Sequence, residues 1–194
     1  MTSKKLLFIN GHPDDGSFGN VLEASYLAAA QSAGHIIKVL RIRELDFDPI
    51  LHHGYRSRQN LEQDLERAKI DIEWADHLVI LYPTWWGSLP ALLKGFFDRA
   101  FHPHWAFKVH KDRLMHERLL TGRTAHLITT MGGPSWFDFL YYHRSAYYTL
   151  SRAILWYCGI KVKKFTIFDN MTRATPEKRA GYLKKMEALG RKGI

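Results

Sequence analysis

Residues 81–101 read LYPTWWGSLPALLKGFFDRAF, and no other stretch says as much about the fold. An apolar run leads into it, a loop holds Trp85 and Trp86, and a helix begins at Pro90, where a first-turn proline loses no hydrogen bond. Two adjacent indoles are unfavourable beside water but can stack on a flat ligand, for about 0.5–1.5 kcal/mol per ring pair beyond burial. The stretch therefore predicts an aromatic ligand, or a cover for the core, at the end of a buried strand.

Strand-like and helix-like segments alternate along the whole chain. Apolar runs predict strands over Lys5–Asn10, Ile36–Ile42, His77–Tyr82, Thr124–Thr130 and Lys161–Phe168. Helical patterns fall between and after them, over Phe18–Ala33, Gln59–Trp74, Pro90–Phe101, Leu140–Tyr157 and Pro176–Leu189. A loop is expected from His102 to Gly122. The alternation predicts an α/β fold, a parallel sheet covered by helices on both faces, in a single domain over residues 1–194.

The composition is that of an ordinary globular protein. Hydrophobic residues make up 46% and charged residues 24% of the 194 positions, and no apolar run approaches the ~20 residues that cross a bilayer. A single cysteine, Cys158, permits no internal disulfide and fits a reducing compartment, so a cytoplasmic location is expected. The net charge of +9 is dispersed and accompanies no nucleic-acid-binding motif. We therefore expect no nucleic-acid partner, and interpret the charge as a solvated surface or as attraction for a phosphate-bearing ligand.

The loop after the first strand has the features of a phosphate site. Residues 11–20 read GHPDDGSFGN and lead directly into a helix, whose free N–H groups and partial positive charge suit a phosphate. Ser17 is expected to cap that helix and bond a phosphate oxygen, and His12 to add a donor from the strand end. The glycine spacing imitates a nucleoside-triphosphate loop but lacks its lysine, so the sequence argues against that ligand.

The same loop allows a zinc-dependent alternative. The run His12-Pro13-Asp14-Asp15 resembles the zinc motif of the LmbE-type de-N-acetylases, in which a His and an Asp bind the metal and a neighbouring Asp acts as base. A zinc hydrolase needs about three protein ligands. The glutamate expected after the second Asp is Gly16 here, and His102 with His104 is the nearest substitute. Zinc-dependent de-N-acetylation therefore remains an alternative function, and the main interpretation includes no metal.

Three segments together resemble a known family. The segment from Pro83 through the helix start PALLKG (residues 90–95) is similar to the flavin-binding loop of the NAD(P)H:quinone oxidoreductases, the DT-diaphorase-like flavoenzymes with a flavodoxin-like fold. The spacing from His12 to Ser17-Phe18 resembles their flavin phosphate loop. The run TTMGG (residues 129–133) resembles their Thr-Thr-Gly-Gly turn with Met131 inserted. The likeness extends from Leu6 to about residue 159.

The resemblance implies a fold and a cofactor. The fold is a flavodoxin-like three-layer sandwich around a five-stranded parallel sheet in the order 2-1-3-4-5. The cofactor is a flavin, FMN with FAD as the alternative, and alanine at Trp86 is expected to weaken its retention. The residues that the resemblance assigns to flavin binding are His12, Ser17, Phe18, Gly19, Asn20, Pro83, Thr84, Trp85, Trp86, Thr129, Thr130, Gly132 and Gly133.

The resemblance also implies a reaction and partners. Hydride passes from NAD(P)H to the flavin, the oxidised cofactor leaves, and a quinone or similar acceptor takes its place in a ping-pong cycle that needs no side-chain nucleophile. The family forms homodimers with the flavin at the subunit junction, and Phe101, Trp105 and Phe107 are the expected interface residues. An electron-carrier flavodoxin and a regulatory subunit of a membrane transporter remain alternatives.

One further residue is a catalytic candidate. The classical enzymes of the family use a Tyr and a His to handle charge on the flavin, and His143 falls at the spacing of that His. The Tyr position aligns instead with Phe137 or Asp138, according to where the inserted methionine is placed. We therefore predict a catalytic role for His143 without predicting a Tyr-His relay.

Overall fold

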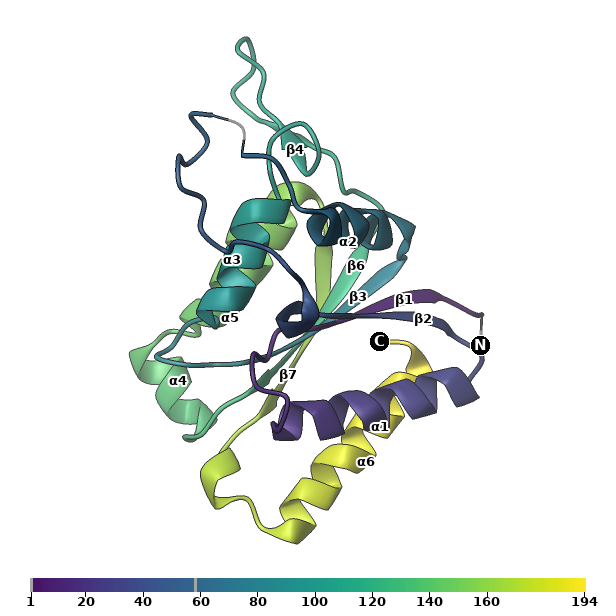
Figure 1. Cartoon of the computed structure of the whole chain (residues 1–194). Coiled ribbons are helices and arrows are strands. Elements are labelled where there is room, and N and C mark those ends of the chain that lie inside the picture. The colour runs from purple at the N-terminus through teal and green to yellow at the C-terminus, as the bar shows by residue number, and fades with distance from the viewer. Residues whose placement is uncertain (1, 58) are drawn as a thin grey trace.

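The structure is a computed structural model that describes residues 2–57 and 59–194. Its strands, drawn as arrows in Figure 1, are β1 (Lys5–Asn10), β2 (Ile36–Arg41), β3 (His77–Pro83), β4 (Phe107–Lys108), β5 (Glu117–Arg118), β6 (Thr124–Thr130) and β7 (Lys161–Phe168). The α-helices are α1 (Phe18–Ser32), α2 (Gln63–Trp74), α3 (Ala91–Ala100), α4 (Ser135–Tyr141), α5 (Ser145–Tyr148) and α6 (Pro176–Lys192). The other helical segments are the 3-10 turns η1 (Ile42–Glu44) and η3 (Met171–Arg173) and the π-helix η2 (Thr149–Trp156).

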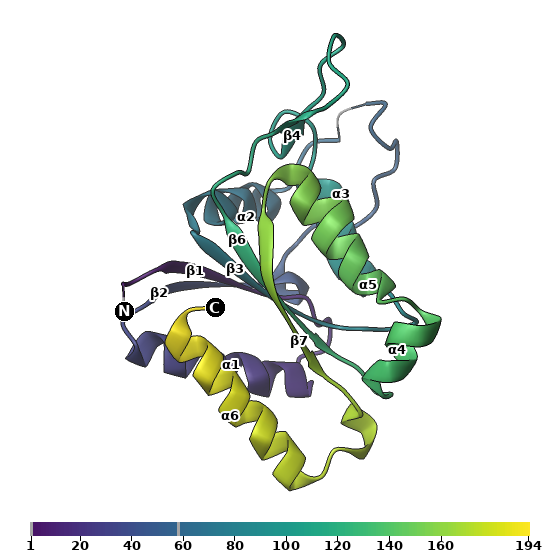
Figure 2. The same cartoon turned by 180° about the vertical axis from the view of Figure 1, so that it is seen from behind.

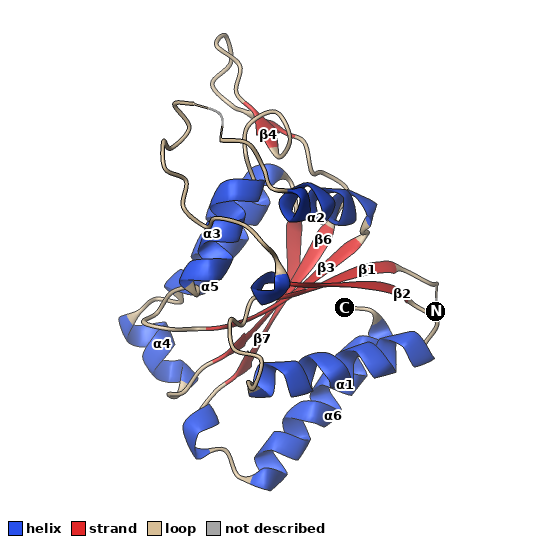
Figure 3. Ribbon diagram, viewed as in Figure 1, coloured by secondary structure: helices blue, strands red, loops and turns tan. Residues whose placement is uncertain are grey.

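A five-stranded sheet lies at the centre of the molecule. Its order is β2-β1-β3-β6-β7, and all of its strand pairs are parallel. Helices α1 and α6 cover one face, whereas α2, α3 and the α5–η2 helix cover the other (Figure 3). Because β6 and β7 are the fourth and fifth strands of this sheet, the predicted flavodoxin-like order is confirmed.

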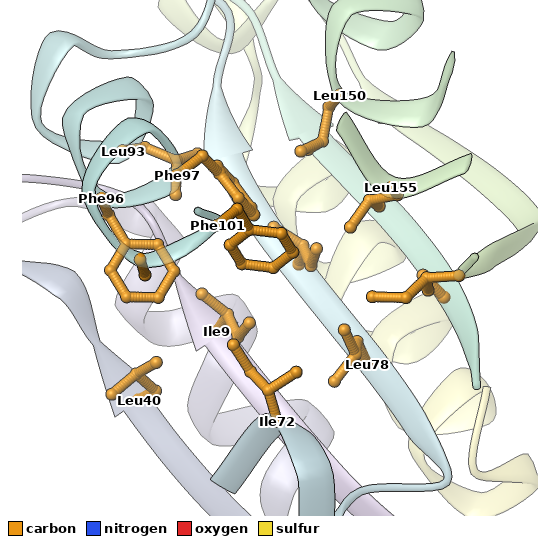
Figure 4. Close-up of a cluster of buried hydrophobic side chains, with 14 of the residues drawn as sticks. Ile9, Leu40, Ile72, Leu78, Leu93, Phe96, Phe97, Phe101, Leu150 and Leu155 are labelled. Carbon is orange, nitrogen blue, oxygen red and sulfur yellow. The ribbon is translucent and has the colours of Figure 1, made fainter. Parts of the chain in front are cut away.

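Two apolar clusters fill the space between the sheet and its helix layers. Strand β3 is buried along its whole length, as expected for a central strand with both faces covered. In the cluster of Figure 4, Phe96, Phe97 and Phe101 from the α3 segment pack with strand residues such as Ile9. The cluster on the other face includes Phe8, Leu22, Tyr26 and Phe168. Phe101 is only 4% exposed, so its expected place on a dimer interface is wrong.

The helix predicted over Leu140–Tyr157 is wrong in its start and its continuity. Pro134 stands at the N-cap of α4, so helical structure begins at Ser135, before the predicted boundary. The chain then breaks at His143 and Arg144, whose φ angles are +49° and +54°. A new helix starts at Ser145 and runs on into η2. The positive φ angles cannot continue a right-handed helix, and they are set by tertiary contacts that local sequence does not show.

Several other boundaries differ from the expectation, two of them by more than a few residues or by a whole element. The segment His102–Gly122, expected as a loop, contains the short antiparallel ribbon of β4 and β5. Phe107 of that ribbon packs edge-on against Tyr157, with ring centroids 5.0 Å apart, so a distant helix holds the ribbon in place. Helix α2 begins at Gln63 and not at Gln59. Among the residues that the structure describes, no helix combines the length and the apolar character that a membrane crossing requires.

Candidate functional site

Four loops meet at the carboxyl edge of the sheet and surround a hollow of about 280 Å³. They follow β1, β3, β6 and β7, and this edge is where parallel α/β sheets bind ligands. The hollow is lined by His12, Asp14, Ser17, Phe18, Gly19, Pro83, Thr84, Trp85, Thr130, Met131, Gly132 and Met171. Most residues that the resemblance assigned to flavin binding are therefore brought together by the fold.

Ser17 leaves a buried hydroxyl at the start of α1. It occupies the N-cap position, but its side chain makes no capping hydrogen bond, so the predicted side-chain cap is wrong. The Oγ atom is buried and has no hydrogen-bond partner in the described structure. A Cβ atom at Gly19 would lie 3.2 Å from this Oγ, so the glycine keeps the space beside the hydroxyl open. A buried polar group without a partner costs about 1–3 kcal/mol, and a ligand oxygen at this helix end would remove that cost.

His12 contributes a second donor to the same wall. Its Nδ1 atom accepts a hydrogen bond from the backbone N–H of Asp14 at 3.1 Å, which leaves the ring proton on Nε2. Burial lowers the pKa of His12, and this effect outweighs the opposite influence of Asp14. The imidazole stands edge-on to Trp85, with ring centroids 5.6 Å apart. At neutral pH His12 is therefore a neutral N–H donor beside an aromatic wall.

Asn20 stabilises the loop after β1 from the side that faces away from the hollow. Its side-chain amide donates to the carbonyl of Asp15, and its Oδ1 accepts from Asn10 Nδ2 at 2.8 Å. Asn10 in turn donates to Glu23 at 2.6 Å and accepts from the backbone N–H of His12 at 3.0 Å. This partly buried network fixes the loop, and it explains why Asn20, a predicted binding residue, does not line the hollow.

The two tryptophans occupy different environments. Residues 85–88 form a tight turn in which the backbones of Trp85 and Ser88 exchange hydrogen bonds of 3.1 and 2.8 Å. Trp85 lines the hollow, but Trp86 sits at the turn tip with φ +51° and is 95% exposed. A positive φ is rare for a bulky residue, and such strain concentrates at functional sites. The described structure thus gives only Trp85 a place at the hollow.

The turn is anchored from the α4–α5 segment. The Gly87 carbonyl accepts hydrogen bonds from the Ser145 hydroxyl and from the backbone N–H of Ala146, the latter at 3.1 Å. A Cβ atom at Gly87 would lie 2.7 Å from Cγ of Tyr142. Gly87 also has a φ of +67°, so close approach and backbone conformation both require a glycine.

Buried hydroxyls connect the second and third loops. The Oγ1 atoms of Thr84 and Thr129 lie 2.7 Å apart, and the Thr84 N–H donates to the Thr130 carbonyl at 2.8 Å. Thr129 is therefore a support for Thr84 and does not itself line the hollow. Gly132 lines the hollow and Gly133 does not.

Sequence reasoning missed three residues of the lining. Met131 was noted only as an insertion, yet it lines the hollow, as does Met171 in η3. The Met171 N–H donates to the Met131 carbonyl at 3.0 Å, which joins the loops after β6 and β7. Asp14 lines the hollow while accepting a hydrogen bond from the Gly16 N–H at 2.9 Å. The position of Met171 just after the last strand was the available signal, since all carboxyl ends share one edge.

His143 lies outside the hollow. It is exposed in the link between α4 and α5, where its backbone φ is positive. Its neighbours Phe137 and Tyr141 stack with centroids 4.4 Å apart on the exposed side of α4, and Asp138 is buried with its pKa raised by burial. The catalytic role of His143 stays a prediction.

The described structure does not bring together the three ligands that the zinc-dependent alternative requires. Residues 2–57 and 59–194 contain no cluster of three His, Cys, Asp or Glu side chains that could hold a metal ion. Asp15, one of the two aspartates in the motif, forms an ion pair with Arg43 at 2.8 Å. His102 bonds its own neighbour, the Pro103 carbonyl, through Nδ1 at 2.7 Å.

Comparisons with known proteins identify the family and support the fold described above. The family described as having a flavodoxin-like fold matches residues 4–189. The chain belongs to this family. Among flavodoxin-like relatives, an uncharacterized NAD(P)H oxidoreductase of Haemophilus influenzae is 26% identical over 85% of this chain and 83% of its own length. A ribosyldihydronicotinamide dehydrogenase [quinone] of Pongo abelii is 25% identical over 93% of this chain and 88% of its own length. These names confirm the predicted resemblance to oxidoreductases.

Solved structures share the flavodoxin-like architecture. The crystal structure of Smu.1420 from Streptococcus mutans superposes with a TM-score of 0.77 at 29% identity and covers 97% of this chain and 99% of that one. An NAD(P)H:quinone oxidoreductase from Methanothermobacter marburgensis gives a TM-score of 0.80 at 21% identity, with 98% of each chain covered. An FMN-dependent NADH-azoreductase from Bacillus anthracis, solved with FMN, gives 0.74 at 19% identity and covers 97% of this chain and 98% of its own. The last two show the fold alone.

Proposed function

We propose that the protein is a flavin-dependent NAD(P)H oxidoreductase that reduces quinones or similar acceptors. The observation that carries the proposal is the hollow at the carboxyl edge, where a helix N-terminus, the unpartnered Ser17 hydroxyl and the Trp85 ring come together. The names of the relatives from Haemophilus influenzae and Pongo abelii support the reaction class.

The residues present fit a flavin mononucleotide. The Ser17 hydroxyl, the His12 Nε2–H and the free N–H groups at the start of α1 would hold the phosphate, because all are donors at one wall. Trp85 and the backbone of the Pro83–Thr84 segment would border the ring system. We favour FMN over FAD because a flavodoxin-like neighbour was solved with FMN.

The bound flavin would accept hydride from NAD(P)H and pass it to the acceptor. The chain itself would position the flavin and shield it from water. The Thr84–Thr129 hydroxyl pair and the Trp85–Ser88 turn hold two loops in register, so the wall that would border the ring system is fixed before the flavin binds. Since the chemistry needs no side-chain nucleophile, both substrates can use one open face in turn, which is the basis of the ping-pong cycle in this proposal.

We further propose that the protein works as a homodimer. Helix α4, beside the hollow, exposes Trp136, Phe139, Leu140 and Tyr141 by 54–66%. Neighbouring exposed apolar side chains of this size mark interaction surfaces. A second copy seated on α4 would cover them and close the flavin face from one side. Analytical ultracentrifugation that finds a monomer with and without FMN would contradict this part of the proposal.

Steady-state kinetics test the proposed reaction. The purified protein, loaded with FMN, is assayed with NADH or NADPH at several fixed concentrations of a soluble quinone and, separately, of an azo dye. A ping-pong oxidoreductase gives parallel lines in double-reciprocal plots. An enzyme that binds both substrates together gives intersecting lines, and a carrier gives no multiple turnover with either acceptor.

A further inference from the structure

The side of the molecule formed by α5, η2 and β7 has an unbalanced charge. Between Asp138 and Asp169 the chain contains no aspartate or glutamate but five cations, which are Arg144, Arg152, Lys161, Lys163 and Lys164. These elements lie next to each other in space, with β7 at the edge of the sheet (Figure 2). This stretch of the chain therefore carries five positive charges and no carboxylate between its two flanking aspartates.

Aromatic rings are exposed among these cations. Tyr148 and Trp156 are 40% and 48% exposed along one side of the α5–η2 helix, and Arg152 lies between them in the sequence. The Arg152 guanidinium lies 4.4 Å from the Tyr148 ring centroid, and Arg118 of β5 lies 3.6 Å from that of Trp156.

Trp156 borders two adjoining surface hollows, which makes the surface continuous. In the described part of the chain, neither hollow is lined by an aspartate or glutamate. We call this surface the cationic aromatic face, and its residues are Arg118, Tyr148, Arg152, Trp156, Lys161 and Lys163.

Protection of the sheet edge accounts for only part of this face. Lysines and bulges on an edge strand prevent pairing with other sheets, and β7 has a register shift opposite Ala125 and His126 beside its lysines. However, Arg152 and Trp156 belong to the helix, and Arg118 belongs to the β4–β5 ribbon. Edge protection does not require an arginine stacked on an exposed tryptophan away from the edge strand.

We propose that the cationic aromatic face docks the protein on the surface of an anionic phospholipid bilayer. Lysine and arginine near such a surface are attracted by its negative potential. Tryptophan and tyrosine favour the headgroup region, because one part of each ring is apolar and the other forms hydrogen bonds. The proposal does not depend on the proposed oxidoreductase reaction, since the face shares no residue with the lining of the hollow.

Two other occupants fit the face less well. A single-stranded nucleic acid binds by stacking its bases on free aromatic faces, but the rings of Tyr148 and Trp156 each carry a guanidinium on one face. A second copy in a twofold dimer centred on this face would bring two copies of the same positive patch together. Arg152, Lys161 and Lys163 would then lie near like charges.

Vesicle sedimentation tests the proposal. The purified full chain is mixed with vesicles of phosphatidylcholine alone, or of phosphatidylcholine and phosphatidylglycerol in a two-to-one ratio, and the pelleted fraction is measured. We expect binding to the anionic vesicles only, with release by salt. The double variant Arg152→Glu/Lys163→Glu should partition at least about thirty-fold more weakly, because each basic charge lost near the surface costs about a factor of five and the added carboxylates are repelled in addition.

A matched double variant separates this face from net charge. Lys184→Glu/Lys192→Glu makes the same change of charge on α6, which covers the opposite face of the sheet, and should keep vesicle binding within about twofold of the unchanged chain. Both double variants should retain the circular dichroism spectrum and any activity with soluble acceptors. Failure of the unchanged chain to sediment, equal loss in both double variants, or binding of single-stranded DNA in preference to vesicles would overturn the proposal.

Tryptophan quenching supplies an independent readout that needs no charge reversal. Anionic vesicles with bromine-labelled acyl chains should quench the fluorescence of the unchanged chain. Trp156→Phe should lose most of that quenching, whereas Trp74→Phe, in the core-facing layer of α2, should not. Quenching that persists in Trp156→Phe would place another surface on the membrane and overturn the assignment of this face.

Discussion

At the residue scale, the site is marked by polar atoms that have no partner among residues 2–57 and 59–194. The Ser17 hydroxyl is buried and unpartnered, and the Nε2–H of His12 is a donor on the same wall. Such groups lower the stability of the ligand-free protein and increase the affinity for a ligand that can satisfy them. This is the pattern expected of a phosphate site at a helix N-terminus.

Ser17→Ala should therefore have opposite effects on folding and on binding. Removing a buried hydroxyl without a partner should leave the unfolding free energy of the flavin-free protein unchanged or raise it by up to about 1 kcal/mol. FMN affinity, measured by fluorescence titration, should fall about ten- to hundred-fold, because a hydrogen bond to a charged phosphate is lost.

Ser25→Ala is the matched control for Ser17→Ala. Ser25 lies on the same helix, but its hydroxyl donates to the Leu183 carbonyl at 3.1 Å. We expect that variant to lose about 1 kcal/mol of stability and to keep its FMN affinity. Equal FMN affinity in Ser17→Ala and the unchanged chain would contradict the assignment of Ser17 to the phosphate site.

The two tryptophans give a second residue-scale prediction. Trp85 lines the hollow, whereas Trp86 is almost fully exposed at the turn tip. Both alanine variants should bind FMN more weakly, but Trp85→Ala should lose more affinity, by about tenfold, because only its ring borders the hollow. Parallel FMN titrations of the two variants give the dissociation constants to be compared. A greater loss of affinity in Trp86→Ala would show that the Trp86 ring contacts the flavin in the assembled protein.

At the element scale, the sequence predicted what local patterns determine. The strands Lys5–Asn10, Thr124–Thr130 and Lys161–Phe168 lie where the apolar runs placed them. The break between α4 and α5 was not predictable, because the Tyr142 ring and the Gly87 carbonyl that hold it come from segments far apart in the chain.

The site shows the same division between local and distant information. The loops after β1, β3 and β6 were predictable because strand ends share one edge and each loop carries a motif. Met171 has no motif, and Asn20 was assigned to the hollow although its hydrogen bonds to Asn10 and Asp15 place it behind the loop. Which side of a loop a residue faces depends on partners that only the folded chain brings near.

Gly87→Ala tests the junction between the Trp85–Ser88 turn and α4. The new methyl group would clash with Tyr142, and the alanine would have to keep an unfavourable positive φ. We therefore expect the unfolding free energy, measured with urea, to fall by about 2–4 kcal/mol. Gly34→Ala isolates the second effect, because Gly34 has a φ of +82° but open space around its Cβ position. That control should lose about 1 kcal/mol, and equal losses in the two variants would mean that the Tyr142 contact gives way freely.

At the scale of the whole molecule, the two ends of the sheet have different roles. The carboxyl edge holds the hollow, while the amino-end half buries His77 and His126. Burial lowers the pKa of each imidazole to about 4, from an ordinary value of 6.5. Each ring keeps one nitrogen bonded to a threonine, His77 to Thr124 and His126 to Thr166, and both rings are neutral in the folded protein at physiological pH.

These histidines predict an acid-sensitive fold. Between the folded pKa of about 4 and the unfolded value of 6.5, the unfolded chain binds more protons, so stability is complete above 6.5 and falls as the pH drops toward 4. Each histidine can contribute up to about 3 kcal/mol to that loss. Urea unfolding across this range measures it.

A double variant assigns the acid sensitivity to these two residues. His77→Asn/His126→Asn should have a flatter dependence of stability on pH over the same range, whatever its absolute stability. His53→Asn, at an exposed position, should keep the dependence of the unchanged chain. An unchanged slope in the double variant would show that other groups cause the acid loss.

The central claim is that this flavodoxin-like chain binds a flavin at the carboxyl edge of its sheet and uses it to oxidise NAD(P)H. The most direct test is the visible absorption spectrum of the purified full chain, titrated with FMN and then mixed with NAD(P)H and a soluble quinone. We predict one equivalent of bound yellow flavin, bleaching by NAD(P)H, and recovery of the colour when quinone is added. A chain that stays colourless and takes up neither FMN nor FAD would contradict the account.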